Sequence, residues 1–153
     1  MKLLKPKYII LFFVVNLFVS CQSLKTAVYD QYSYQQAISL KVESDHLLDY
    51  ATEPFMNHSE EVETLLLDLK KLVEYEKNKP NNEISYAMLK LLADENKNLL
   101  AGFLKRWEEE QQLSGVFTTE AKFQIMEAFD LIIKYEADKN KTNETNILEF
   151  LGN

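Results

Sequence analysis

The chain has 153 residues, with 24 aspartate and glutamate residues against 17 lysine and arginine residues. A chain of this length can bury one hydrophobic core, and a single cysteine, Cys21, excludes a disulfide framework. The acidic balance and the presence of only one arginine, Arg106, argue against nucleic acid and anionic lipid headgroups as partners.

The first 20 residues have the layout of a secretion signal. Lys2, Lys5 and Lys7 form a basic start, and residues 8–20 are almost wholly apolar. A transmembrane helix needs about 20 consecutive apolar residues, and this run is shorter. We therefore expect residues 1–20 to be a signal peptide, whose removal leaves a mature chain with a formal charge of −10.

The sequence FVSC at residues 18–21 ends this run and resembles the lipobox of bacterial lipoproteins, although Phe18 stands where leucine is usual. The resemblance implies that a peptidase cuts before Cys21 and that fatty acids such as palmitate are attached there. Cys21 is then the lipid attachment site, which anchors the protein to a membrane, and residues 21–25 form a lipidated linker. A secreted protein without lipid and an uncleaved membrane anchor are the alternatives.

The chain as a whole is similar to the small helical lipoproteins of Gram-negative cell envelopes, a resemblance that implies no enzymatic activity. It implies a place in the cell envelope. Gln22 and Ser23 supply no acidic residue after the cysteine, and such a residue retains some lipoproteins at the inner membrane. We therefore expect the outer membrane, with the protein facing the periplasm.

After the linker, apolar residues recur along the chain at the spacing that is typical of amphipathic helices. Pro54, Pro80 and Gly115 divide it into four segments, of which the first two span about residues 26–51 and 59–77. The apolar positions of the first segment are Tyr34, Ile38 and Val42 on one helical face, with Leu47, Leu48 and Ala51 taking over after a polar patch. Those of the second segment, at the spacing of an amphipathic helix, are Val62, Leu65, Leu66, Leu69, Leu72 and Val73.

The third and fourth segments span about residues 82–113 and 118–138. Their apolar stripes consist of Met88, Leu92, Leu99, Phe103 and Trp107 in the third, and Phe123, Met126, Phe129, Ile133 and Ala137 in the fourth. The polar run ADENKN at residues 93–98 indicates a kink or a buried polar layer in the third helix. Trp107 is expected to be half-buried at one end of the bundle.

Residues 139–153 are predicted to be a polar loop followed by a short apolar segment, ILEFL, at residues 147–151. This segment either docks on its own domain or stays available to a partner, and docking is favoured because exposed apolar clusters are a liability. Together these patterns predict an all-α protein. The expected architecture is an up-and-down antiparallel four-helix bundle of residues 26–138, with a short apolar C-terminal segment.

Two polar groups are candidate binding sites. Glu43 and His46 have the E-x-x-H spacing of di-iron bundles, with Asp49 one turn further, but the second pair that a di-iron site needs is missing. A single ion at Asp45, His46 and Asp49 is the alternative to a solvated helix end, so no metal site is predicted.

Glu95 and Asn96 are the second candidate, because they project near the side of the apolar stripe. They could form a polar pocket or a register-setting layer inside the bundle. The alternative is a boundary pair that bonds to water or to tyrosine hydroxyls.

Motifs that carry catalysis were not found: the sequence has no G-x-S-x-G, no H-E-x-x-H and no glycine-rich phosphate loop. We predict neither catalytic residues nor a cofactor.

The leading hypothesis is a non-enzymatic, lipid-anchored envelope protein that acts by contact with another protein, such as an accessory or structural subunit of an envelope complex. One alternative is a helical bundle that binds a small molecule or a metal, with or without enzymatic activity. The other is an inhibitor or immunity-like protein whose acidic surface covers a basic partner.

Overall fold

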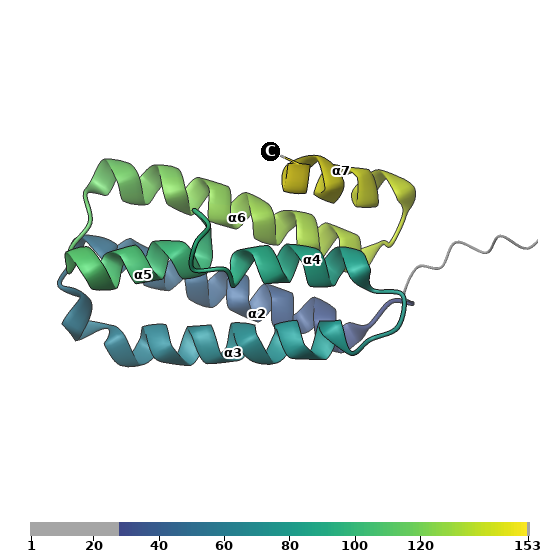
Figure 1. Ribbon diagram of the computed structural model, residues 1–153, viewed down its shortest axis with the longest axis horizontal. Coiled ribbons are helices and arrows are strands. Elements are labelled where there is room, and N and C mark those ends of the chain that lie inside the picture. The colour runs from purple at the N-terminus through teal and green to yellow at the C-terminus, as the bar shows by residue number, and fades with distance from the viewer. Residues whose placement is uncertain (1–27, 153) are drawn as a thin grey trace, which may run out of the picture.

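The computed structural model describes residues 28–152, which are all-helical and contain no strand (Figure 1). The predicted signal peptide, Cys21 and the predicted linker at residues 21–25 lie outside the described residues. The elements are α2 (Gln31–Leu48), η1 (Asp49–Thr52), η2 (Phe55–Asn57), α3 (Ser59–Lys77), α4 (Glu83–Leu92), α5 (Leu100–Glu110), α6 (Gly115–Ala137) and α7 (Lys141–Gly152). Within this part of the chain, no helix combines the length and apolar composition that a membrane crossing requires.

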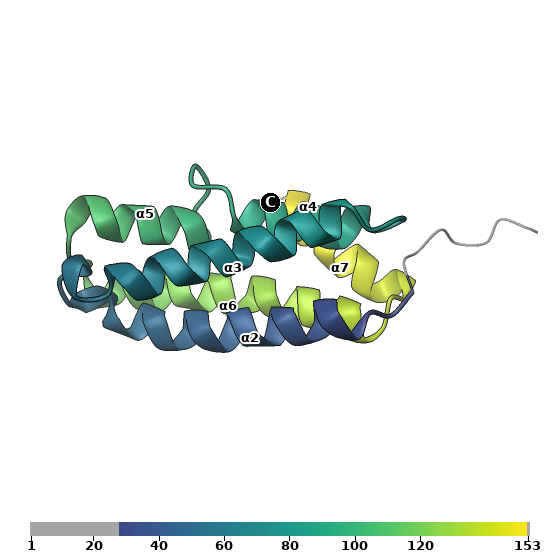
Figure 2. The same cartoon turned by 90° about the horizontal axis from the view of Figure 1, so that it is seen from below.

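Helices α2 and α6 pack side by side and run in opposite directions (Figures 1 and 2). Lys41 of α2 forms an ion pair with Asp130 of α6, whereas Asp49, which follows α2, bonds to Lys122 of α6. Residue numbers therefore rise along one helix as they fall along the other.

The buried face of α2 differs from the predicted one. Val42 is 62% exposed, and Tyr34 and Ile38 are only partly buried. The buried residues of α2 are Ser33, Ala37, Leu40, Ser44, Leu47 and Leu48. Three of these six are serine or alanine, whose small side chains allow the backbones of two helices to approach closely. The predicted face was therefore wrong for Tyr34, Ile38 and Val42, whereas Leu47, Leu48 and Ala51 are buried as predicted.

Helix α3 begins and ends where the sequence predicts, and it packs against α2 and α4. Glu60 and Glu61 lie in its first turn, where their negative charges interact favourably with the positive end of the helix dipole and stabilise the helix. Leu69, at the centre of its apolar face, is buried in the core.

The third predicted helix is two helices, α4 and α5, separated by residues 93–99. The Asp94 carboxylate accepts hydrogen bonds from the backbone and side-chain nitrogens of Asn96, at 2.9 and 3.1 Å, and this local turn competes with the helix. The carbonyl oxygen of Lys97 approaches Gly102, where a Cβ atom would lie only 1.8 Å from it. All five residues of the predicted stripe are nevertheless buried in the core.

Trp107 of α5 is completely buried, whereas the sequence indicated a half-buried side chain. Its indole Nε1 donates a hydrogen bond of 3.0 Å to the carbonyl oxygen of Glu53, and the ring of Phe55 meets it edge-on at 5.5 Å. The segment between α2 and α3 therefore covers this end of α5 and supplies the partner that a buried indole needs.

The C-terminal segment docks on its own domain, as expected, but it is longer than predicted. Helix α7 begins at Lys141, inside the predicted polar loop, and folds back along α6 and α4 (Figures 1 and 2). Ile147 is fully buried, and Phe150 and Leu151 pack against the core.

Candidate functional site

A network of buried polar side chains occupies the end of the molecule where α2 and α4 begin and α3 and α6 end. Its centre consists of two glutamates, Glu76 and Glu136, each only 1% exposed. Such groups are rarely buried unless they are paired. The arrangement of their partners therefore determines what this site can do.

The first half of the network surrounds Glu76, near the end of α3. The hydroxyl of Ser33, on α2, donates a hydrogen bond to Glu76 Oε1. The ammonium of Lys79 lies 3.1 Å from Glu76 Oε2, 2.8 Å from the Ser33 hydroxyl and 3.3 Å from Asp30 Oδ2. Asp30 also accepts hydrogen bonds from the Tyr75 hydroxyl, at 2.7 Å, and from the first turn of α2, at 2.9 Å. Lys79 therefore ties the start of α2 to the end of α3.

The second half surrounds Glu136, near the end of α6. The hydroxyl of Ser85, on α4, donates to Glu136 Oε1, and the ammonium of Lys139 donates to the same oxygen at 2.8 Å. Lys139 also donates to the side-chain carbonyl of Asn82 at 3.1 Å. The amide nitrogen of Asn82 in turn donates to Glu76, so this asparagine joins the two halves.

The two halves match residue by residue. Tyr75–Lys79 and Tyr135–Lys139 both have the sequence Y-E-x-x-K at the end of a helix, and each lysine lies over the ring of its tyrosine, at 5.7 and 5.2 Å. Ser33 and Ser85 are each followed by a tyrosine and each bond to the glutamate of the neighbouring helix. The network is therefore built from one local pattern used twice.

Burial and neighbouring groups shift the pKa values of three side chains at the edge of the network, Asp30, Tyr75 and Tyr135. Burial would raise the pKa of Asp30, but hydrogen bonds from Tyr75 and the Tyr32 backbone, with the charge of Lys79, lower it from 3.8 to about 2. The same bond to Asp30 raises the pKa of Tyr75 to about 12. Burial, followed by nearby negative charges, raises the pKa of Tyr135 to about 12.

One buried atom of the network has no hydrogen-bond partner. Glu136 Oε2 is inaccessible to solvent, and the Lys79 ammonium is 3.9 Å away, which is an ion-pair distance rather than a hydrogen bond. A buried carboxylate that is incompletely satisfied carries an energetic cost. It is therefore a feature that packing alone does not explain.

The first candidate site from the sequence, at the end of α2, holds the lysine side chain of Lys122. The ammonium of Lys122 lies 3.0 Å from Asp45 Oδ1 and also bonds to Asp49. Burial would lower the pKa of Lys122, but these two carboxylates raise it. His46 packs edge-on against the ring of Tyr50, at 5.2 Å. Among residues 28–152, no cluster of three or more histidine, cysteine, aspartate or glutamate side chains has the geometry to hold a metal ion.

The second candidate site from the sequence does not lie inside the molecule. Glu95 and Asn96 are both exposed, in the connection between α4 and α5, and Glu95 pairs with Lys105 across 3.7 Å at the surface. A buried polar layer, one of the two alternatives for this pair, is therefore excluded, because the chain leaves the helix there and places these side chains in water.

The sequence analysis missed Glu76 and Glu136, although both carry a recognisable signal. Glu76 follows Leu72 by four residues on the buried stripe of α3, and Glu136 follows Ile132 by four residues on that of α6. The signal is the position of each glutamate on the apolar stripe, and the lysine three residues later supplies a partner for its charge.

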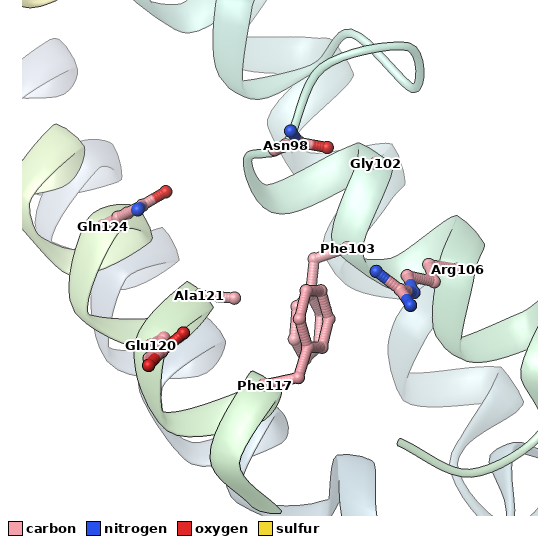
Figure 3. Close-up of a pocket in the computed structure, with 8 residues that line it drawn as sticks. All are labelled: Asn98, Gly102, Phe103, Arg106, Phe117, Glu120, Ala121 and Gln124. Atoms are coloured by element: carbon pink, nitrogen blue, oxygen red, sulfur yellow. The ribbon is translucent and has the colours of Figure 1, made fainter. Parts of the chain in front are cut away.

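A shallow cavity of about 230 Å³ lies between α5 and α6, at the other end of the molecule (Figure 3). The rings of Phe103 and Phe117 stack within it, 5.7 Å apart and nearly parallel, and the guanidinium of Arg106 covers the Phe117 ring at 4.2 Å. Beside it, Val116 and Phe123 of α6 are 73% and 71% exposed.

No protein-family model matches the chain, and no curated protein or solved structure is significantly similar to it.

Proposed function

We propose that the protein is a lipid-anchored component of the cell envelope that acts by contact with another protein, through the surface where α5 ends and α6 begins. The observation that carries this proposal is the exposure of large apolar side chains there. Val116 and Phe123 are two helical turns apart and therefore lie along one line of α6. We call them, with the adjacent cavity between Phe103 and Phe117, the α5–α6 surface.

The position of this surface agrees with an anchor at Cys21. Helix α2 begins at Gln31, at the opposite end of the molecule from the start of α6 (Figure 1). At 1.5 Å per residue, the 13 residues from Phe123 to Glu136 alone span about 20 Å. An anchored protein would therefore hold the α5–α6 surface away from the membrane and toward a periplasmic partner.

Charge indicates the chemistry of that partner. Glu120 lines the cavity, where the charge of Arg106 is paired with Glu110 at 2.8 Å, and the mature chain has a formal charge of −10. The partner that fits is a protein that inserts an apolar side chain between basic residues. Complementary charge of this kind mainly accelerates association and improves specificity.

The arrangement that we propose for the helices is an up-and-down four-helix bundle, with α4 and α5 together in the place of one helix and α7 added to the outside. In support, α2 packs against α3, α3 against α4, α4 against α6 and α6 against α2. Short connections between consecutive helices favour antiparallel neighbours.

The contact hypothesis is tested by replacing Phe123, in the full-length protein in cells, with a photo-reactive phenylalanine analogue. Leu67, 51% exposed on α3, is the matched control position. We expect illumination to give one defined protein adduct at position 123 that is absent at position 67. No adduct at position 123, or the same adducts at both positions, would contradict the proposal.

The anchor is tested separately with Cys21→Ser. The unmodified protein should be recovered with an acylated N-terminal Cys21, and the variant should accumulate as a precursor that retains residues 1–20. Mass spectrometry distinguishes the two forms. Normal cleavage of the variant would refute lipidation and leave the contact hypothesis to the cross-linking result.

A further inference from the structure

The geometry points to a covalent cross-link inside the buried network: we infer that Lys139 and Asn82 form an isopeptide bond by self-catalysed loss of ammonia. The bond would join the chain before α4 to the chain after α6. This inference concerns the domain itself and does not depend on the anchor or on a partner.

The two reacting side chains are in hydrogen-bond contact. Lys139 Nζ donates a hydrogen bond of 3.1 Å to the side-chain oxygen of Asn82, and the carbonyl carbon that an amine attacks, Cγ, is bonded to that oxygen, so a small movement of Nζ from oxygen to carbon starts the reaction. Both side chains are buried, Asn82 at 3% exposure and the Lys139 side chain at 6%. A nucleophile held against its electrophile in this way reacts at an effective concentration far above that of free molecules.

Each of the two reacting nitrogens has its own buried carboxylate. Glu136 Oε1 accepts a hydrogen bond from the Lys139 ammonium at 2.8 Å, and Glu76 accepts one from the amide nitrogen of Asn82. Glu136 is therefore placed to remove a proton from the nucleophile, and Glu76 to deliver one to the leaving group. Proton transfer from Lys139 to Glu136 also removes two charges from a site where burial makes charges costly.

Lys79 lies between the carboxylates of Glu76 and Glu136, and we assign the unpartnered Glu136 Oε2 a role in proton transfer to Lys79. Its ammonium lies 3.1 Å from Glu76 Oε2 and 3.9 Å from Glu136 Oε2, the atom without a hydrogen-bond partner. Protons can therefore pass from Lys139 to Glu136, Lys79 and Glu76, and then to the leaving nitrogen. The contact of 3.9 Å is the longest step and must shorten during transfer.

The reaction balances without any further reagent. The lone pair of Lys139 Nζ forms a bond to Asn82 Cγ, and the bond between Cγ and Nδ2 breaks, with its electron pair leaving on Nδ2. One ammonium side chain and one carboxamide become one secondary amide and one ammonium ion. No oxidant, reductant or cofactor is required, and the chain loses the mass of one ammonia molecule.

The test is peptide mapping of the full-length protein after trypsin digestion. Trypsin does not cut before Pro80, and it cannot cut after an acylated Lys139, so the expected product is residues 78–90 joined to residues 135–141. Its mass is the sum of the two peptides minus one ammonia. If only the unlinked peptides are recovered, both from fresh protein and after incubation at mildly alkaline pH, the inference is wrong.

Two variants assign the chemistry. Lys139→Arg keeps the positive charge beside Glu136 but cannot form the amide, and Glu136→Gln removes the proton acceptor. Both variants should lack the linked peptide, and circular dichroism should show that both remain helical. Lys141→Arg is the matched control, because Lys141 pairs with Glu144 at the surface, outside the network, and should retain the linkage. A linked peptide that persists in Lys139→Arg, or that joins a different pair of residues, would overturn the assignment.

Discussion

The substitution Gly102→Ala tests the connection between α4 and α5, because we expect it to destabilise the protein, whereas replacing a helical glycine with alanine usually stabilises one. Alanine in place of glycine inside a helix normally stabilises a protein by about 0.5 to 1 kcal/mol. At Gly102 the new Cβ would lie 1.8 Å from the carbonyl oxygen of Lys97 and 2.9 Å from its carbonyl carbon. Both are backbone atoms, so relief requires the whole connection to move.

We expect Gly102→Ala to lower the free energy of unfolding by about 1 to 3 kcal/mol, the usual cost of overpacking, despite the gain in helix propensity. Gly115→Ala is the matched control, since a Cβ there meets no atom within 4 Å; it should be neutral or slightly stabilising. Urea unfolding monitored by circular dichroism measures both variants. If Gly102→Ala is as stable as Gly115→Ala, then the connection does not fold back over α5 as described.

Three further predictions concern stability. Asp30→Asn keeps a capping side chain but removes the charge. Because the pKa of Asp30 is lowered from 3.8 to about 2 in the folded state, its contribution is fully present above about pH 4 and is lost as the pH falls through about 2, so by urea unfolding the variant should be less stable by about 1 to 2 kcal/mol at neutral pH, after allowance for solvent screening, and the difference should shrink steadily below pH 4 and vanish below about pH 2. Leu69→Ala should cost about 2 to 5 kcal/mol in the same assay, whereas Leu67→Ala, at an exposed position, should cost little; similar losses would contradict the assignment of the buried face. Deleting residues 145–153 removes the buried Ile147 and should lower the melting temperature by several degrees, or about 1 to 2 kcal/mol, and an unchanged melting curve would show that α7 adds no stability.

The candidate site was harder to predict than the helices. Sequence reasoning selected Asp45, His46 and Glu95 because their residue types and spacing are typical of binding sites. The structure places all three where they are exposed, with Asp45 neutralised by Lys122. Glu136 was overlooked because a single glutamate at the end of an amphipathic helix usually faces water.

The contacts that give the network its chemistry cross long stretches of chain. Ser33 and Glu76 are 43 residues apart, Ser85 and Glu136 are 51 apart, and Lys139 reaches back 57 residues to Asn82. The spacing of apolar residues within one helix does not indicate which helix ends will meet in the folded protein. The repeated Y-E-x-x-K pattern marks the residues, but not their partners.

The sequence by itself determined the helical class of the protein, and for α3 it determined both ends. Large apolar residues at helical spacing recur through the chain, and local signals such as prolines and acidic first turns act within a few residues of their own position. These effects need no tertiary partner, so they can be recognised in the sequence alone.

Only the tertiary structure decided which face of the first half of α2 is buried, that α4 and α5 are separate helices, and that two glutamates meet two lysines in the interior. Each depends on what the rest of the chain places nearby: Glu76, for example, can be buried because Ser33, Lys79 and Asn82 satisfy its charge. Burial of a charge costs free energy unless such partners are present, and partners from distant segments exist only once the chain has folded.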